Sequence, residues 1–195
     1  MELEALDYFS GSFFESREFS EALGIVWGFG SLLLRHRDKS LIERFCSLVK
    51  ITGNIFPLTT QKDKIQWAVT VNIGSLFVQR IMSMGYRNIA HIEERPMPQG
   101  DYDRAVFLRT YAQLHYIHDT IRDQGLIKPR IRFNGSTAIL ESLNRHLHEE
   151  LGCSMKKIQN HKVSAKTKLL YYQSKKEVPK VLLWLNEGPD VLCTS

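Results

Sequence analysis

The sequence has few of the features that mark secreted, membrane-spanning or zinc-binding proteins. No apolar run approaches the roughly 18 residues of a membrane span, and the start, Met1-Glu2-Leu3-Glu4, lacks the basic residues of a secretory signal. The three cysteines, Cys46, Cys153 and Cys193, lie far apart and outside metal-ligand spacing, which argues against a disulfide framework and a zinc site. We therefore expect a soluble, cytoplasmic protein with no membrane contact and no cofactor.

Positive charge is concentrated in the later part of the chain. Residues 1–21 hold six acids and one arginine, whereas 22–95 hold ten bases against five acids and 96–195 hold fifteen against ten. The densest stretch, 130–180, has eleven bases and four acids. Such a surface attracts phosphate backbones because binding releases condensed counterions. Lysines on a solvated face would give the same count, so both interpretations stay open.

The chain is long enough for two small folded units. Its 195 residues, 43% of them hydrophobic, can bury one core or two cores of about 80 to 100 residues each. Two segments, 22–31 and 107–116, can be read as degenerate copies of one helix, and a similar run of predicted elements follows each. We expect an acidic N-terminal segment at 1–20, a first repeat at 21–95, a linker at 96–102 and a second, basic repeat at 103–195.

The first repeat is predicted to alternate helices and strands. Ser20 is expected to cap a helix that begins near Glu21 and ends at Gly30. From the spacing of apolar residues, further helices are predicted from Asp38 or Ser40 to Gly53 and over 72–84, and strands at 31–37, 55–59 and 65–71.

The second repeat is predicted to follow the same order. Its expected elements are a helix over 103–117, hairpin strands at 120–122 and 127–133, a helix from Ser136 to Gly152, strands around Ile158 and at 167–173, and a helix over 177–185. The hairpin has no full counterpart in the first repeat, where only 31–39 fills its place. The first repeat is therefore expected to have one short strand instead of a pair.

Both repeated segments resemble the LAGLIDADG motif of homing endonucleases. The first has small residues, Gly24 and Gly28, at the third and seventh motif positions, and a glycine closes it. The second is similar to the FLRGYFDGDG form of the motif, because it keeps Phe107-Leu108-Arg109 and Tyr111. The resemblance implies an α+β fold with two pseudo-symmetric αββαββα repeats that form a saddle over DNA.

The resemblance extends beyond the motifs, since 130–188 is similar to the second half of compact bacterial members of the family. In this family the two motif helices pack against each other on a pseudo-twofold axis, and such close contact needs small side chains. The positions implied in this packing are Gly24, Gly28, Thr110 and Leu114, of which the last two fit less well. A chain that carries both repeats is expected to be a monomer.

The catalytic positions of the motif lack acidic residues. In the family, one carboxylate from each motif helix holds Mg²⁺ for phosphodiester hydrolysis. The corresponding positions are Phe29, which cannot ligate Mg²⁺, and His115, a poor ligand for so hard a cation. Helical geometry directs Glu21 and Asp119 elsewhere, so surface roles are expected for both. His118 lies one helical turn after His115, a spacing that could hold a transition metal, but no third ligand is evident. A polar helix end or a packed histidine pair is expected instead. We expect no metal site and no enzyme activity.

Basic residues on predicted strands and turns are expected to contact DNA instead. They are Arg35, Arg37, Lys62 and Lys64 in the first half, and Arg130, Arg132, Lys162, Lys166 and Lys168 in the second. Contacts to phosphates position a protein on the duplex without reading its sequence. Because the first repeat is shortened, the second is expected to supply most of the affinity.

Three functions remain open from the sequence. The first is a DNA-binding protein, such as a regulator, that keeps the scaffold but has lost the nuclease, with double-stranded DNA as its partner. The second is a protein-interaction module or inhibitor that docks a protein partner through the acidic segment or the basic face. The third is a working Mg²⁺-dependent endonuclease or an RNA-binding, maturase-like relative.

Overall fold

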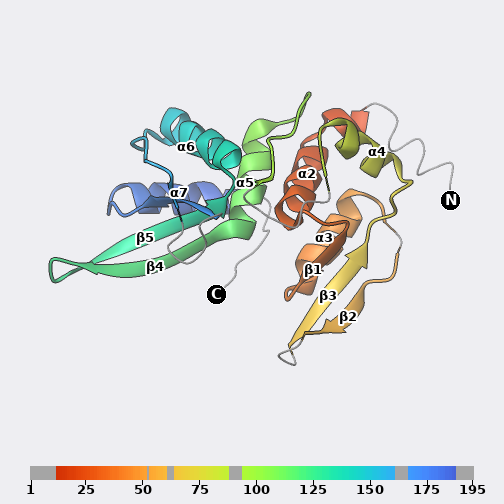
Figure 1. Cartoon of the computed structure of the whole chain (residues 1–195), viewed down its shortest axis with the longest axis horizontal. Coiled ribbons are helices and arrows are strands. Elements are labelled where there is room, and N and C mark those ends of the chain that lie inside the picture. Colours follow the sequence, from red (N-terminus) through yellow and green to blue (C-terminus); the bar gives the residue numbers. More distant parts are fainter. Residues whose placement is uncertain (1–11, 52, 61–63, 88–93, 161–166, 188–195) are drawn as a thin grey trace. The chain divides into compact units, whose positions relative to one another are not determined.

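A computed structural model describes residues 12–51, 53–60, 64–87, 94–160 and 167–187 (Figure 1). The chain divides into two compact units. The first unit comprises Met1–Ala90 and Pro98–Phe107, and the second comprises His91–Met97 and Leu108–Ser195. Each has its own antiparallel sheet. More than half of the expected acidic segment 1–20 lies outside the described residues.

The first unit is built on a three-stranded sheet. Its elements are η1 (Ser12–Glu15), α2 (Arg17–Phe29), β1 (Leu33–His36), α3 (Lys39–Leu48), β2 (Phe56–Thr59), β3 (Ile65–Thr70) and α4 (Leu76–Ser83). The central strand β3 pairs antiparallel with β1 on one side and β2 on the other. Leu34 and Val69 are register partners and both are buried, because α3 packs on this face of the sheet. All three strands expected from the sequence are confirmed.

The first helix begins earlier than the sequence suggested. The Ser16 side chain caps α2 by accepting from the Phe19 backbone N–H at 3.1 Å, so the expected cap at Ser20 is wrong. The extra turn carries Phe19 into the core, where its side chain is fully buried. Ser20 is buried instead, and its hydroxyl accepts from the Asp103 N–H at 2.8 Å. Gly30 ends the helix as expected, in the left-handed conformation that glycine adopts without strain.

The other helices of this unit are shorter than predicted. Asp38 caps α3 as expected, accepting from the Ser40 N–H at 2.9 Å, but the helix ends at Leu48, well before Gly53. The α4 helix begins at Leu76 rather than at residue 72, because Asn72 closes a turn on itself: its side-chain oxygen accepts from the Gly74 N–H at 2.9 Å. A short side chain that bonds to the backbone in this way competes with the first helical turn.

The second unit is built on a four-stranded sheet in the order β4-β5-β7-β6. Its elements are α5 (Arg104–His115), β4 (Tyr116–Asp123), β5 (Leu126–Gly135), α6 (Thr137–Leu151), β6 (Gln159–Asn160), β7 (Lys168–Tyr172) and α7 (Glu177–Asn186); α5 begins in the first unit and continues into the second. Ser136 caps α6, and Gly152 ends it in the left-handed conformation. Both ends were expected from the sequence.

The long hairpin differs most from prediction. The helix was expected to run to Ile117 and the first strand to cover only 120–122, but α5 ends at His115 and β4 begins at the next residue. The reason is pairing: β4 is antiparallel to β5 along its whole length, from Tyr116 opposite Phe133 to Asp123 opposite Leu126. Backbone groups in the ladder are satisfied by a distant segment, which local helical spacing does not reveal.

The two sheets share a topology apart from one strand. In each unit the strand that precedes the middle helix, β1 or β5, pairs with the strand that precedes the last helix, β3 or β7. A shorter strand, β2 or β6, completes the other side. The counterpart of β4 would lie between α2 and β1, and the structure describes no strand in that stretch.

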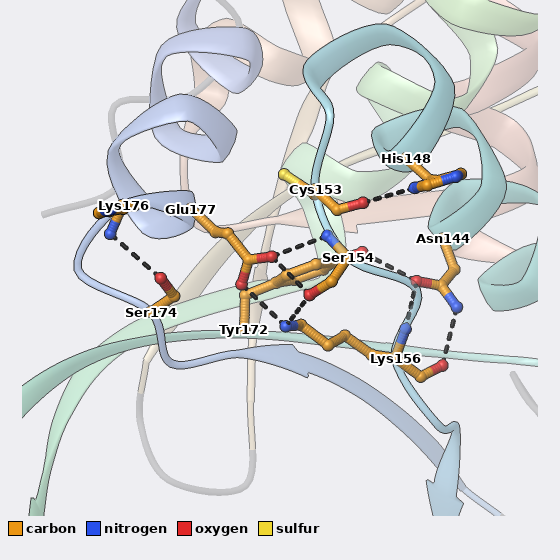
Figure 2. A network of polar contacts seen from close by, with 9 residues as sticks. All are labelled: Asn144, His148, Cys153, Ser154, Lys156, Tyr172, Ser174, Lys176 and Glu177. Carbon is orange, nitrogen blue, oxygen red and sulfur yellow. Dashed lines mark hydrogen bonds and ion pairs between the residues drawn. The ribbon is translucent and has the colours of Figure 1, made fainter.

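A polar network ties the strands of the second unit to its helices (Figure 2). The buried Asn144 side chain bonds the backbone of Lys156 and the hydroxyl of Tyr172. The Lys156 ammonium in turn lies 2.8 Å from the Glu177 carboxylate, which also accepts from Ser154 at 2.7 Å. These contacts hold three segments on α6: the connection that precedes β6, the strand β7, and the start of α7.

The two cysteines among the described residues form no disulfide. Cys46 and Cys153 are free thiols in buried positions, and burial raises the pKa of both. Cys193 lies outside the described residues. Across the described ranges, no helix combines the length and the apolar character needed to cross a membrane.

Candidate nucleic-acid interface

The two faces of the second unit's sheet differ in character. On the face packed against α6 and α7, Ile131, Phe133, Leu170 and Tyr172 are buried. Side chains alternate between faces along a strand, and register partners share a face. The opposite face, which we call the open face, carries Ile117, Asp119 and Ile121 of β4, Lys128, Arg130 and Arg132 of β5, and Leu169 and Tyr171 of β7.

One carboxylate on the open face holds two arginines. Asp119 Oδ1 accepts from Arg130 Nε at 2.8 Å, and Oδ2 accepts from Arg130 Nη2 at 2.9 Å. Oδ2 also accepts from Arg132 Nη2 at 2.6 Å. Asp119 and Arg130 are register partners on neighbouring strands, and Arg132 follows two residues along β5 on the same face. The three groups carry a net charge of +1.

The pairing shifts the pKa values of the groups that form it. The hydrogen bond from Arg130 and the charges of both arginines lower the pKa of the Asp119 carboxyl, although burial opposes them. The same bond raises the pKa of the Arg130 guanidinium. All three side chains are between 24% and 30% exposed, so each is held against the sheet while part of it stays accessible.

The outer hairpin extends past the rest of the sheet (Figure 1). β7 pairs with β5 only between Ile131 and Gly135, whereas β4 pairs with β5 as far as Leu126. At the tip, Leu126 and Ile127 are 62% and 61% exposed. A two-stranded ribbon is narrow enough to enter a DNA major groove.

The predicted lysines of the second half do not join the arginine pair. Lys168 is the register partner of Gly135, which places it on the helix-covered face, and its ammonium donates to Asn160 Oδ1 at 2.6 Å. Lys162 and Lys166 lie outside the described residues. The structure thus brings together Arg130 and Arg132 and places Lys168 on the other face.

The corresponding face of the first unit carries fewer charges. Arg35 lies on it, exposed, beside its register partner Ala68, with the apolar Phe56 and Leu58 of β2 on the same face. Arg37 and Lys64 are exposed at the ends of β1 and β3, and Lys62 lies outside the described residues. On this face the described strands of the first unit therefore carry one cationic residue, Arg35, where the second unit has the arginine pair.

The motif positions that carry catalysis in the family lie at two helix ends. Phe29 is the last residue of α2, and its ring centroid lies 6.3 Å from that of His36. His115 is the last residue of α5, and its ring lies 4.6 Å from that of Tyr111. Phe29 offers no ligand atom, and imidazole suits Mg²⁺ poorly. The side chains present at these positions do not fit the two-carboxylate magnesium site of the motif.

Arginines hold both acids that the sequence singled out. Glu21, expected at the surface, is 3% exposed, and its oxygens accept from Arg44 of α3 at 2.8 and 2.7 Å. Asp119 is held on the open face. His118 is on β4 and not on a helix with His115, so the expected helical pair does not form. Within the described part of the chain, no three His, Cys, Asp or Glu side chains are grouped so that they could hold a metal ion.

The small residues of the motif helices are mostly buried. Gly24 and Gly28 are buried in α2, Thr110 is buried in α5, and Leu114 is half-buried. Gln113, at the sixth motif position, is also buried and donates through Nε2 to the Leu185 carbonyl at 2.6 Å. The expected packing of the two motif helices through Gly24, Gly28, Thr110 and Leu114 stays a prediction.

Sequence reasoning missed the part played by Asp119 because it placed this residue beyond a helix end. One signal could have found it. Ile117, Thr120 and Ile121 are β-branched, and such residues favour strands over helices. With the hairpin turn at Gln124-Gly125, a strand through 117–121 puts Asp119 opposite Arg130.

Comparison with known proteins identifies the fold. No family model and no curated protein matches the sequence. Among solved structures, the chain is similar to the N-terminal LAGLIDADG domain of DUF199/WhiA, with 13% identity and a TM-score of 0.53, over 96% of this chain and 89% of that one. It is also similar to the I-LtrWI LAGLIDADG homing endonuclease bound to target DNA, with 14% identity and a TM-score of 0.56, over 89% of this chain and 85% of that one.

These likenesses show that the chain has a LAGLIDADG-type α+β fold. They cover both units and agree with the element order, since the second unit has the full αββαββα sequence of elements and the described residues of the first show one strand fewer. The fold expected from the sequence is confirmed. At 13–14% identity the comparison concerns the fold alone.

Proposed function

We propose that this protein binds double-stranded DNA without cutting it, and that the open face of the second unit is its main contact surface. The arginine pair on that face carries the proposal. Two guanidinium groups share one carboxylate, so the face keeps a net positive charge and accessible N–H donors. Arginines placed in this way on an exposed sheet contact phosphates and the edges of bases.

The fold supports the choice of DNA over other polyanions. I-LtrWI, whose fold this chain shares, is bound to target DNA. The projecting β4–β5 hairpin has the width of a ribbon that enters a major groove. The basic composition of 130–180 adds the electrostatic attraction that duplex binding requires.

The proposed loss of cutting rests on the residues at the motif positions. Hydrolysis by this fold family needs carboxylates that hold Mg²⁺ beside the phosphate. Phe29 and His115 stand there, and the acids nearest to them in the sequence, Glu21 and Asp119, are engaged by arginines. A monomer that occupies a site without cleaving it is suited to regulation, which is the role we propose.

The experiment is a salt-titrated binding assay on short duplex DNA, single-stranded DNA and RNA. We expect the duplex to bind best and its affinity to fall steeply between about 50 and 200 mM salt. Arg130→Gln with Arg132→Gln should weaken binding at least tenfold. A matched pair on the helix-covered side, Arg145→Gln with Lys180→Gln, removes the same charge and should have a much smaller effect.

Several outcomes would contradict the proposal. Absence of duplex binding at low salt, or stronger binding to RNA, would overturn it. Nicking of supercoiled plasmid that requires Mg²⁺ would show that the nuclease is retained. A stable protein complex that survives nuclease treatment, together with no DNA binding, would favour the interaction module instead.

A further inference from the structure

The hydrogen bonds to Asp119 leave specific edges of both arginines available. Arg130 uses Nε and Nη2 on the carboxylate, so its Nη1 group takes no part in the pairing. Arg132 uses Nη2 alone, and its Nε is buried and cannot reach a base, so the Nη1 group is the part of this guanidinium that stays outside the pairing. A guanidinium has five N–H groups in one plane. Each arginine therefore keeps donors after binding Asp119.

The carboxylate also fixes the planes of these donors. A free arginine loses much rotamer freedom when it binds a base, whereas one that is already held on a carboxylate loses less. Two bonds to Arg130 define its plane fully, and one bond restrains Arg132. Because Asp119 lies on the neighbouring strand, the sheet itself sets the spacing of the pair.

We propose that Asp119 is a positioning residue that determines sequence specificity: it presents Arg130 and Arg132 as a fixed pair to two guanines in the major groove. This inference rests on the proposed function. Arginine forms a two-donor contact with the O6 and N7 atoms of guanine, and this is the commonest specific contact in DNA complexes. No other base offers two adjacent acceptors on its major-groove edge.

The surroundings favour base edges over phosphates as the target. A carboxylate between two arginines repels phosphate and cancels half of their charge, which would weaken a site built for the backbone alone. The open-face neighbours of Arg132 are Ile117 and Tyr171, an apolar and an aromatic side chain. Ile117 has no donor for a phosphate, and the Tyr171 ring offers a flat surface on which a base can stack.

The distance between the two arginines predicts how the guanines are arranged in the DNA site. Arg130 and Arg132 are two residues apart on one strand, about 6.6 Å along it. Successive bases of one strand are about 3.4 Å apart along the helix axis. The pair therefore suits two guanines within three consecutive base pairs.

The test is selection of bound sequences from a pool of random duplexes, with the full chain and with Asp119→Asn. We expect the wild type to enrich a guanine pair within three base pairs. Asp119→Asn should lose this enrichment, with discrimination against substituted guanines falling about 10- to 100-fold. Its affinity for the unselected pool should be unchanged or higher, because a negative charge has been removed from the contact face. Glu43→Gln removes one carboxylate from the first unit and should leave the selected sequence as it is.

A second variant separates charge from geometry. Arg130→Lys keeps the positive charge but cannot form the two-donor bond with Asp119, so it should keep the salt dependence and lose guanine enrichment. If Asp119→Asn selects the same sequence as the wild type, the inference is wrong while DNA binding stands. The same holds if the wild type enriches no guanine. If the wild type binds no duplex, the proposed function fails first and the inference with it.

Thermal unfolding distinguishes positioning from a purely structural role. A variant that disturbed the sheet would lower the melting temperature and weaken binding to all sequences alike. We expect Asp119→Asn to bind the unselected pool normally and to differ in sequence preference. A uniform loss of affinity with a large loss of stability would contradict the inference.

Discussion

Asn144 of α6 and Tyr172 of β7 form a buried hydrogen bond, in which the Tyr172 hydroxyl donates to Asn144 Oδ1 at 2.9 Å (Figure 2). The same amide accepts from the Lys156 N–H at 3.1 Å and donates to the Lys156 carbonyl at 2.8 Å. Burial raises the pKa of the Tyr172 hydroxyl, so it stays a donor. This one side chain joins a helix, a strand and a connecting segment. Through β7, which pairs with β5, it supports the strand that carries the two arginines.

Asn144→Leu should destabilise the second unit by about 2–4 kcal/mol, because it removes three hydrogen bonds and leaves the Tyr172 hydroxyl buried without a partner. Native-state hydrogen exchange should show the loss of protection in β5, β7 and α6. The exposed Asn160, whose side-chain oxygen accepts from Lys168, provides the control: Asn160→Ala should change stability by about 0.5 kcal/mol or less. Equal effects of the two substitutions would contradict the structural importance of the hydrogen bonds made by Asn144.

Arg44→Ala should destabilise the first unit by about 2 kcal/mol, since it leaves the buried Glu21 carboxylate without its partner. The cost is below that of a fully buried pair because the Arg44 side chain is 39% exposed. Urea unfolding measures the change. Glu21→Leu with Arg44→Leu should recover most of the loss, because no charge then remains buried. A double variant as unstable as Arg44→Ala would show that lost packing, and not the unpaired charge, is responsible.

Glu177 should make stability depend on pH in acid. Burial raises the pKa of its carboxyl, but bonds from Lys156 and Ser154 outweigh this and lower it below the ordinary value of 4.5. The contribution is thus complete above about pH 4.5 and is lost as the pH falls through the lower folded value. Glu177→Gln should cost about 1 kcal/mol at pH 7 and less at pH 3. Urea unfolding at both pH values tests this, and a penalty that grows in acid would contradict it.

The two sheets should contribute unequally to DNA affinity. Lys128→Gln on the open face removes one cation, and the slope of log affinity against log salt should fall by about 0.9 if it contacts a phosphate. Arg35→Gln, on the shortened sheet of the first unit, should change the slope less. Salt-titrated anisotropy on one duplex compares them directly. A larger effect of Arg35→Gln would move the main contact surface to the first unit.

Local pattern was a good guide where neighbouring residues decide the outcome. Helix stops at Gly30 and Gly152 follow from the backbone freedom of glycine, and the Asp38 and Ser136 caps follow from short oxygen-bearing side chains. Ser20 was misjudged for the same kind of reason, because Ser16 is an equally good cap and only the burial of Phe19 favours the longer helix.

The candidate site could be predicted only in part. Arg130 and Arg132 were identified as basic residues on a predicted strand, and the structure places both on one face of β5. Lys168 was assigned the same role, but its face depends on which residue of β5 it opposes. Strand register is set by pairing between distant segments, and a shift of one residue exchanges the two faces.

The amino-acid sequence by itself determined the order of the elements, the absence of acidic residues at Phe29 and His115, and the concentration of positive charge in the second half. These properties depend on residue identity and on periodicity within a few turns. Only the tertiary structure decided that Asp119 stands on a strand beside Arg130. That contact depends on the register between β4 and β5 over their whole length. The physical reason is that strand register is set by hydrogen bonding and burial between segments that are distant in the sequence.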